Sequence, residues 1–277
     1  MTAQITASPC KAVILARGLG TRMRQRDAQA SLNAAQTRAA DAGVKALMPI
    51  DRPFLDYVLH ALAQAGFTQV CLVIGPEHQR VREYYEEQVR PHRLRIGFAV
   101  QPEPRGTADA VLAAEPFAGP DLFLTINADN YYPRQALDLL HACKEPAVAL
   151  FDRAALLRGS NIEADRLARF AVAEVAPDGR LSRIIEKPDA ATLARLGPKA
   201  PVSMNCWLFG PAIFAACRAI GPSPRGEYEL TDAVQYAIDA LHQRLRVLTV
   251  YAPVLDLSCR ADVPAVAARL AGTEVDL

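Results

Sequence analysis

The sequence lacks the features that assign a chain at once to a disulfide-rich, zinc-binding or membrane class. Its six cysteines include no C-x-x-C pair, and Cys71, Cys206 and Cys217 lie in apolar runs, which argues against a disulfide framework or a zinc site. No apolar run approaches the roughly 18 residues of a membrane-spanning helix. Residues 1–10 contain neither the charged start nor the apolar core of a secretory signal. These absences favour a cytoplasmic globular protein without a membrane partner.

An excess of charge of either sign is also missing. The formal net charge is +1, from 31 Lys and Arg against 30 Asp and Glu, which gives no support for a nucleic-acid partner. Hydrophobic residues make up 51% of the chain, enough to bury a sizeable core. The sequence contains no internal repeat and no low-complexity linker, so we expect a single domain over residues 1–277 whose function is carried by its motifs.

In the first half of the chain, short apolar runs alternate with helical patterns. Residues 11–16 are apolar and β-branched in the middle, which is typical of a buried strand, and residues 53–65 have helical spacing and stop at Gly66. Further strands are predicted at 69–74, 94–100 and 121–126, with helices at 81–89 and 107–114. This alternation predicts an α/β, Rossmann-like fold with a mixed, mostly parallel sheet flanked by helices, in which ligands bind beyond the carboxyl ends of the strands.

After about residue 145 the pattern favours strands. They are predicted at 147–151, 170–175, 183–186, 202–209 and 245–251, with helices at 211–219 and 230–241. An Ala- and Gln-rich stretch at 27–42 should be helical and should end at Gly43. Since this stretch has few large apolar residues, we predict a mobile lid over the binding site, with a surface helix at a subunit interface as the alternative.

A glycine-rich turn follows the first strand. Gly18 and Gly20 let the backbone pass close to phosphate oxygens, and Arg22 adds a cation with a bidentate fork. Met23 stands where a dinucleotide fingerprint has its third glycine, and no G-K-[ST] follows, so the turn is neither that fingerprint nor a P-loop. By itself the turn is equally compatible with a tight connection between a strand and a helix.

The motifs that follow the turn carry more information than the turn itself. In order along the chain they are a K-x-L-x-P segment at 45–49, a Gln-Pro segment at 101–108, Ala-Asp-Asn at 128–130, Glu-Lys-Pro at 186–188, an R-G-E-x-E-x-T-D segment at 225–232 and Leu-Asp-Leu at 255–257. Each is modest alone. Together with the turn at 17–23, this succession resembles the sugar nucleotidyltransferases, or nucleoside-diphosphate-sugar pyrophosphorylases, over roughly residues 11–265.

The resemblance implies a nucleotidyltransferase (GT-A-like) fold, a nucleotide-binding part at about 10–145 and a sugar-phosphate-binding part at about 146–265. The substrates would be a nucleoside triphosphate and a sugar 1-phosphate, and the cofactor Mg²⁺ held by Asp129 and Asp256. Catalytic roles fall on Arg22, Lys45, Asp129 and Lys187. Nucleotide-binding roles fall on Ala16, Gly18, Gly20, Thr21, Gln101, Gly106 and Thr107, and sugar-phosphate-binding roles on Ala171, Glu186, Lys187 and Asn205.

These residue types suit a reaction between two anions. An ionised sugar phosphate attacks the α-phosphorus of the triphosphate, so positioning and charge neutralisation supply most of the catalysis and no general base is needed. Carboxylates suit Mg²⁺, which prefers hard oxygen ligands and bridges phosphate oxygens. A homo-oligomer is compatible with these features, but the sequence gives no oligomeric state.

Some positions depart from the family pattern. Arg17 replaces a small residue and either reaches the triphosphate as an extra cation or restricts the pocket. Ala171 and Cys206 stand at usual glycine positions near the sugar, and Leu255 replaces a common aromatic residue. The distance from Arg22 to Lys45 is 23 positions, roughly twice that of the family as we know it. These changes indicate an unusual branch of the family.

Two questions stay open on the sequence alone. The first is the base, because Gln101 and residues 225–232 favour dTTP or UTP whereas residues 106–111 resemble adenylyltransferases. The second is the activity itself. A metal-dependent glycosyltransferase of related fold and a non-catalytic nucleotide-sugar sensor are the alternatives, and Asn127 stands where the Asp-x-Asp motif of the former needs its first aspartate.

Overall fold

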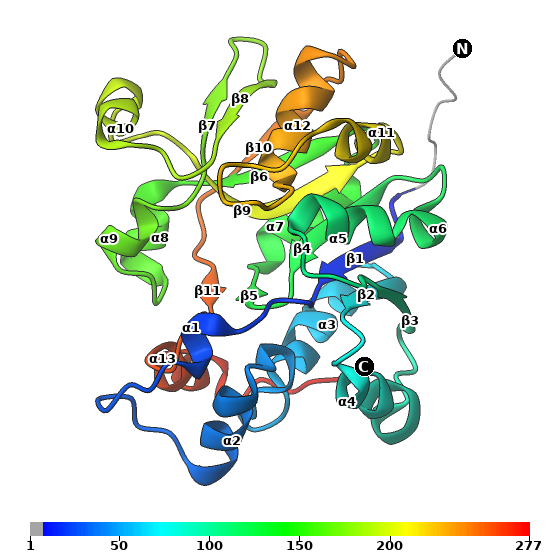
Figure 1. The fold of residues 1–277 in the computed structure, drawn as a ribbon, viewed down its shortest axis with the longest axis vertical. Coiled ribbons are helices and arrows are strands. Elements are labelled where there is room, and N and C mark those ends of the chain that lie inside the picture. The colour runs from blue at the N-terminus through cyan, green and yellow to red at the C-terminus, as the bar shows by residue number, and fades with distance from the viewer. Residues whose placement is uncertain (1–7) are drawn as a thin grey trace.

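The computed structural model describes residues 8–277 (Figure 1). Most of residues 1–10, where the sequence shows no secretory signal, therefore lies outside the described part. The strands are β1 (Lys11–Leu15), β2 (Gln69–Ile74), β3 (Arg95–Val100), β4 (Phe123–Asn127), β5 (Asn130–Tyr131), β6 (Ala147–Phe151), β7 (Val172–Val175), β8 (Leu181–Ile185), β9 (Val202–Phe209), β10 (Arg246–Val250) and β11 (Leu255–Asp256).

Helices connect most of these strands. In the first half they are α1 (Thr21–Arg24), α2 (Ala34–Ala42), the 3₁₀ turn η1 (Lys45–Leu47), α3 (Phe54–Gln64), α4 (Gln79–Glu83), the π-helical turn η2 (Tyr84–Val89), α5 (Thr107–Ala113), α6 (Glu115–Ala118) and α7 (Arg134–Ala142). In the second half they are α8 (Arg153–Gly159), α9 (Ala164–Leu167), α10 (Ala190–Leu196), α11 (Ala212–Ala219), α12 (Leu230–Asp239) and α13 (Asp262–Leu270).

A mixed sheet runs through the centre of the molecule in the order β10-β6-β9-β4-β1-β2-β3, with β7 and β8 joined beside β9. Strands β4, β1, β2 and β3 are parallel, and β9 is antiparallel to both of its neighbours. The predicted α/β fold with a mostly parallel sheet is confirmed. Because β9 lies between β4 and β6, the sheet continues without a break across residue 145.

Alternate side chains of the central strands enter different cores. On β1, Ala12 and Ile14 belong to one core, with α3 and α7, whereas Val13 belongs to the other, with α5, α11 and α12. This alternation follows from the period of two in a strand, and it explains why the central strands are mostly apolar on both faces. The helices therefore cover both faces and leave the strand ends free for a site (Figure 1).

The inserted stretch is less helical than its composition predicts. Helix α2 covers Ala34–Ala42, and residues 27–33 form turns and irregular chain, so the helix prediction is wrong for that part. Asn33 is the reason for the later start, because its side chain accepts from the Gln36 amide and the Gln36 side chain accepts from the Asn33 amide, a capping box. The helix is also anchored, because Ala40 is fully buried and Arg260 pairs with Asp41.

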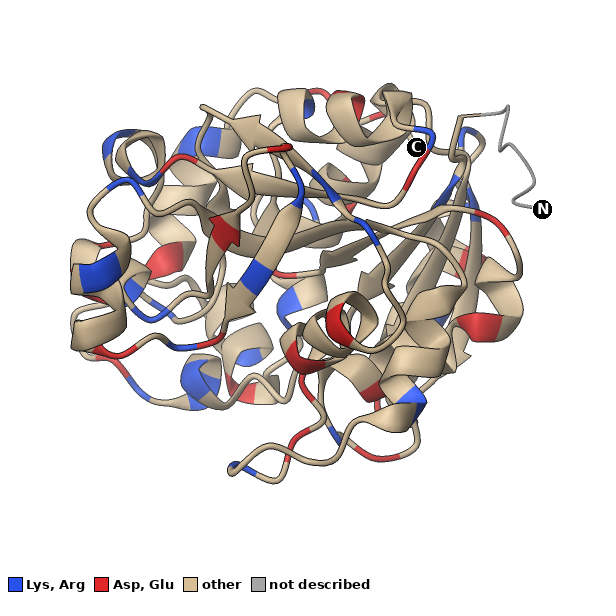
Figure 2. Ribbon diagram, turned by 90° about the horizontal axis from the view of Figure 1, so that it is seen from above, with Lys and Arg blue, Asp and Glu red and all other residues tan. Residues whose placement is uncertain are grey.

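The charges on the chain are mixed over the molecule. Figure 2 shows segments with Lys or Arg interspersed with segments carrying Asp or Glu, in keeping with the net charge of +1. Among residues 8–277, no helix has the length and apolarity needed to cross a bilayer.

Candidate nucleotide-binding site

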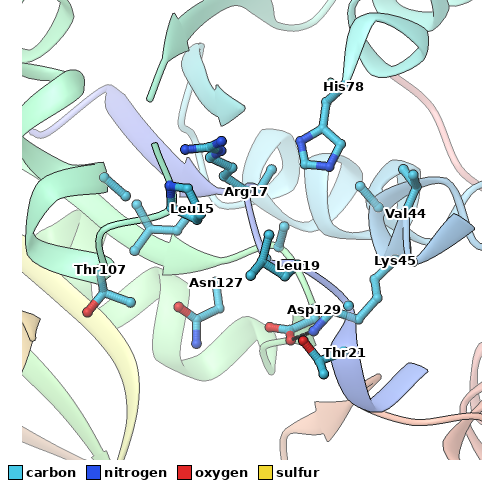
Figure 3. Close-up of a pocket in the computed structure, with 18 of the residues that line it drawn as sticks. Leu15, Arg17, Leu19, Thr21, Val44, Lys45, His78, Thr107, Asn127 and Asp129 are labelled. Carbon is cyan, nitrogen blue, oxygen red and sulfur yellow. Dashed lines mark hydrogen bonds and ion pairs between the residues drawn. The ribbon is translucent and has the colours of Figure 1, made fainter. Parts of the chain in front are cut away.

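A cavity of about 380 Å³ opens beyond the carboxyl ends of β1, β3 and β4 (Figure 3). Its walls come from segments far apart in the sequence, namely the glycine turn, the segment before η1, the residues after β3 and those after β4. The predicted residues that line it are Ala16, Gly18, Gly20, Thr21, Arg22, Lys45, Gln101, Gly106, Thr107 and Asp129. The structure thus brings every residue predicted to bind the triphosphate or the base into one cavity, together with one of the two predicted metal ligands.

The glycine turn is held against the chain that leads to Lys45. Gly20 has φ +62°, and a Cβ there would lie 2.3 Å from the carbonyl oxygen of Gly43, so a side chain would force the two segments apart. A Cβ on Gly18 would lie 3.8 Å from Lys45 Nζ. The ammonium group therefore stands directly across from the turn, while Arg22 is exposed on α1 at the cavity rim.

Asp129 lies at the floor of the cavity, two residues beyond the end of β4. Its carboxylate forms an ion pair with Lys45, and both side chains are largely buried. The two groups can each bind a partner of opposite charge. The carboxylate could hold a metal ion, and the ammonium group could hold a phosphate.

A short two-stranded ribbon brings Asp256 beside Asp129. Strands β5 and β11 pair antiparallel with Asn130 opposite Asp256, and the Leu257 amide donates to the Asp129 carbonyl at 2.8 Å. Asp256 is only 2% exposed and lies behind the cavity wall, whereas its neighbour Ser258 lines the cavity. The prediction that the two aspartates lie close together agrees with this ribbon.

Four groups surround the Asp256 carboxylate. It pairs with Arg166, accepts from the Ser258 hydroxyl at 2.8 Å and from the Asn130 amide at 3.3 Å, and has Asp129 close by. Burial first, and then the charge of Asp129, raise the pKa of Asp256, while Arg166 opposes the rise. Two neighbouring carboxylates that repel each other fit a divalent cation with oxygen ligands, since such a cation removes the repulsion.

Gln101 begins the loop after β3, and its amide group has a fixed orientation. Nε2 donates to the Gly106 carbonyl at 3.0 Å and to Asp109 at 2.7 Å, which uses both of its hydrogens. The side-chain oxygen is therefore left as a hydrogen-bond acceptor on a residue that lines the cavity. Such an acceptor suits a base edge with a ring N–H, as in uracil, thymine and guanine, rather than the unprotonated ring nitrogen of cytosine or adenine.

The segment at 225–232 supports this loop from behind. Tyr228 exchanges backbone hydrogen bonds with both flanks of Gly106, donating to Arg105 at 2.8 Å and accepting from Ala108 at 2.9 Å. Gly106 has φ +117°, and a Cβ there would lie 2.5 Å from the Tyr228 carbonyl oxygen. The Thr107 hydroxyl accepts from the Leu230 amide at 2.9 Å. The resemblance at 225–232 thus corresponds to a structural support for the loop that holds Gln101.

The predicted sugar-phosphate residues lie outside this cavity, on β7, β8, β9 and their ends. Val172 of β7 pairs with Ile185 of β8. Ala171, directly before β7, and Glu186, directly after β8, therefore lie at the same end of this strand pair. Burial, followed by the Glu229 carboxylate, raises the pKa of Glu186 to about 7. Lys187 is exposed with φ 45°.

Asn205 lies on β9, where its backbone carbonyl is close to the hydroxyl of Tyr132. The Tyr132 hydroxyl donates to the Met204 carbonyl at 2.6 Å and lies 3.3 Å from the Asn205 carbonyl, and it accepts from the Asn127 amide at 3.3 Å. Since Tyr132 is fully buried, this hydroxyl fixes β9 relative to the loop that carries Asp129.

Several residues of the site carry no recognisable signal in the sequence. Arg166 and Asp109 belong to no motif, although Asp109 falls inside the segment at 106–111 that resembles adenylyltransferases. Arg17 does stand out in the sequence, which left open whether it reaches the triphosphate or restricts the pocket. Its guanidinium turns away from Lys45 toward the end of β2, where it pairs with Glu77.

Comparison with known proteins supports the fold and identifies relatives of the chain. A solved UDP-glucose pyrophosphorylase in complex with UDP-glucose shares the fold, with a TM-score of 0.72 at 16% identity over 96% of this chain and 100% of that one. A glucose-1-phosphate thymidylyltransferase of Streptomyces griseus is 32% identical over 235 residues, 83% of this chain and 58% of the relative. The UTP–glucose-1-phosphate uridylyltransferase AglF of Haloferax volcanii is 28% identical over 82% of this chain and 83% of its own length.

The chain spans under three fifths of the length of the first curated relatives that it matches. The match to the family itself covers most of the chain, because the family model described as "Nucleotidyl transferase" fits residues 11–251. That range contains the glycine turn, Lys45, Gln101, Asp129 and Lys187. The chain therefore belongs to the nucleotidyl transferase family.

Proposed function

We propose that this protein transfers a nucleotidyl group from a nucleoside triphosphate to a sugar 1-phosphate and releases pyrophosphate and a nucleoside-diphosphate sugar. The observation that carries the proposal is the convergence of the glycine turn, Lys45 and Asp129 on one cavity with Asp256 directly behind Asp129. Such a set offers backbone amides, cations and a carboxylate pair to a polyphosphate.

In this proposal each part of the cavity has its own task. The amides of the glycine turn, Arg22 and Lys45 bind the β- and γ-phosphates and stabilise the pyrophosphate as it leaves. Asp129 and Asp256 would hold Mg²⁺, which would neutralise charge on the phosphate oxygens. Lys45, which pairs with Asp129 in this structure, would turn to the phosphates once that carboxylate serves as a metal ligand.

The second part of the chain accommodates the sugar 1-phosphate. Lys187 contributes the cation for its phosphate, and Glu186 and Asn205 accept from or donate to sugar hydroxyls. Two relatives are glucose-1-phosphate thymidylyl- and uridylyltransferases, which favours a hexose 1-phosphate as the sugar substrate. The acceptor orientation of Gln101, together with the thymidylyltransferase and uridylyltransferase relatives, favours UTP or dTTP, whose bases offer an imide N–H.

The test is a matrix of five triphosphates, ATP, GTP, CTP, UTP and dTTP, against a panel of sugar 1-phosphates with Mg²⁺, measured by pyrophosphate release. We expect turnover with UTP or dTTP and a hexose 1-phosphate. Asp129→Asn is the matched control, and it should lower turnover by at least a hundredfold or so, because it removes an anionic ligand at nearly constant shape. Transfer of sugar from a sugar nucleotide to an acceptor, with no pyrophosphate-dependent reverse reaction, would contradict the proposal.

A further inference from the structure

Arg17 presents an unused hydrogen-bond donor next to the cavity. Its side chain is 6% exposed, and Nε and Nη2 face the Glu77 carboxylate at 3.3 and 3.4 Å, which fixes the plane of the guanidinium. The remaining Nη1 is buried and has no partner within residues 8–277. A buried guanidinium nitrogen without an acceptor is uncommon in a folded protein, and a ligand atom is one way to satisfy it.

His78 supplies a second donor in the same place. Its Nδ1 accepts from the Gly75 amide at 3.2 Å, so in the neutral ring the proton is on Nε2. Burial lowers the pKa of His78, which keeps the ring neutral near pH 7. Figure 3 shows Arg17 and His78 on one side of the cavity, and Thr21, Lys45 and Asp129 on the other.

The order of the strands indicates which part of a nucleotide meets these donors. The sheet runs β4, β1, β2, β3, and the residues at the strand ends are Asp129 after β4, Arg17 after β1, His78 after β2 and Gln101 after β3. Neighbouring strands are about 4.8 Å apart, so the four ends span about 14 Å. If phosphates bind at Asp129 and the base at Gln101, the ribose lies between them, above the ends of β1 and β2.

We infer that Arg17 and His78 form a subsite for the ribose. Both side chains donate hydrogen bonds to the 2′-hydroxyl oxygen, so the subsite favours ribonucleotides over 2′-deoxyribonucleotides. The inference rests on the proposed function for the placement of base and phosphates. It selects UTP over dTTP within the pair of pyrimidine triphosphates that the proposed function favours.

The test compares the binding of UTP and dUTP, which differ only in the 2′-hydroxyl, by calorimetry with Mg²⁺ present and without a sugar phosphate. Inorganic tripolyphosphate is the third probe and reports the phosphate subsite alone. Wild-type protein should bind UTP at least about tenfold more tightly than dUTP, the effect of a hydrogen bond to a charged donor. Arg17→Met should bring that ratio to within about threefold and leave tripolyphosphate binding unchanged.

Two further variants separate the donors from general damage. His78→Asn keeps an acceptor for the Gly75 amide but removes the Nε2 donor, and it should lower the ratio of UTP to dUTP affinity by a smaller factor than Arg17→Met. Arg80→Met removes an exposed arginine of α4 that does not line the cavity, and it should leave all three affinities unchanged.

Equal affinity of the wild type for UTP and dUTP would overturn the inference. So would an Arg17→Met variant that loses tripolyphosphate affinity as strongly as UTP affinity, because Arg17 would then be a phosphate-binding cation. Failure of the proposed function has a different signature, namely no pyrophosphate release in the matrix of substrates while the binding ratio is still measurable.

Discussion

Replacing Arg166 with methionine should destabilise the protein through the charge that it leaves behind. Arg166 pairs with Asp256 through Nη2 and with Asp262 through Nη1 at 2.7 Å, and these two aspartate side chains are 3% and 5% exposed. In Arg166→Met the Asp256 carboxylate keeps the Ser258 hydroxyl and the Asn130 amide but loses its cation. A buried carboxylate without a cation is costly in water-excluded surroundings.

The size of the effect follows from these contacts. Removal of one partner from a buried ion pair costs about 3–5 kcal/mol, and we expect about 3 kcal/mol because the Arg166 side chain is 21% exposed. Asp262 is less affected, since it also accepts from the backbone amides of Ser258 and Cys259 at 2.9 and 2.7 Å. With an unfolding entropy of about 0.6 kcal/mol/K for a chain of this length, the melting temperature should fall by about 5 °C.

The measurement is urea unfolding at pH 7 without divalent cations. Arg166→Met should lose about 3 kcal/mol, and the double variant Arg166→Met/Asp256→Asn should recover a large part of it, because no unpaired charge is then buried. Arg158→Met, at an exposed arginine on α8, is the matched control and should stay within about 0.5 kcal/mol of wild type. A single variant as stable as wild type, or a double variant less stable than the single one, would refute the reasoning.

Three other predictions concern the rest of the site. Lys187→Ala should weaken binding of the sugar 1-phosphate more than that of the triphosphate, and Arg22→Ala the reverse, each by about 1.5–3 kcal/mol in calorimetry; equal losses for both ligands would contradict the assignment. Because burial raises the pKa of Glu186 to about 7, its stabilising contribution is present at pH 4.5 and below and is lost as pH rises through 7. Glu186→Gln should therefore gain melting temperature relative to wild type between pH 5 and pH 8, and a constant difference would argue against it. Gly106→Ala should lower the unfolding free energy by about 1–3 kcal/mol in urea, since its Cβ would lie 2.5 Å from the Tyr228 carbonyl; an unaffected variant would show that this contact yields easily.

The long elements of the fold could be predicted because their signal is local. The strands at 147–151, 202–209 and 69–74 have the predicted bounds, since each is a mainly apolar run closed by polar residues, Gly or Pro. Strands β5 and β11 could not be predicted, because each has two residues and its pairing partner lies more than a hundred residues away. The start of α2 was missed although its signal was present, an asparagine three residues before a glutamine at Gln36.

The candidate site divides in the same way. The residues of the glycine turn, Lys45, Gln101 and Asp129 could be predicted to converge, because they follow strand ends that meet at one edge of the sheet. The burial of Asp256 and its contact with Arg166 depend on α9 and the ribbon, which carry no local pattern. The orientation of the Gln101 amide depends on Asp109, whose side chain cannot be placed without the helix α5 that carries it.

The ribbon of β5 and β11 also sets the order in which the carboxylate pair can assemble on the ribosome. Asp129 and Asp256 are 127 positions apart, and at about 5–20 residues per second the second aspartate is synthesised some 6–25 s after the first. Throughout that interval a nascent chain already holds Lys45, the cation that pairs with Asp129 in the finished protein. A nascent chain that has not yet reached Leu255 can thus neutralise its first aspartate but has no second carboxylate beside it, so the metal site of the proposed function would be completed only with β11.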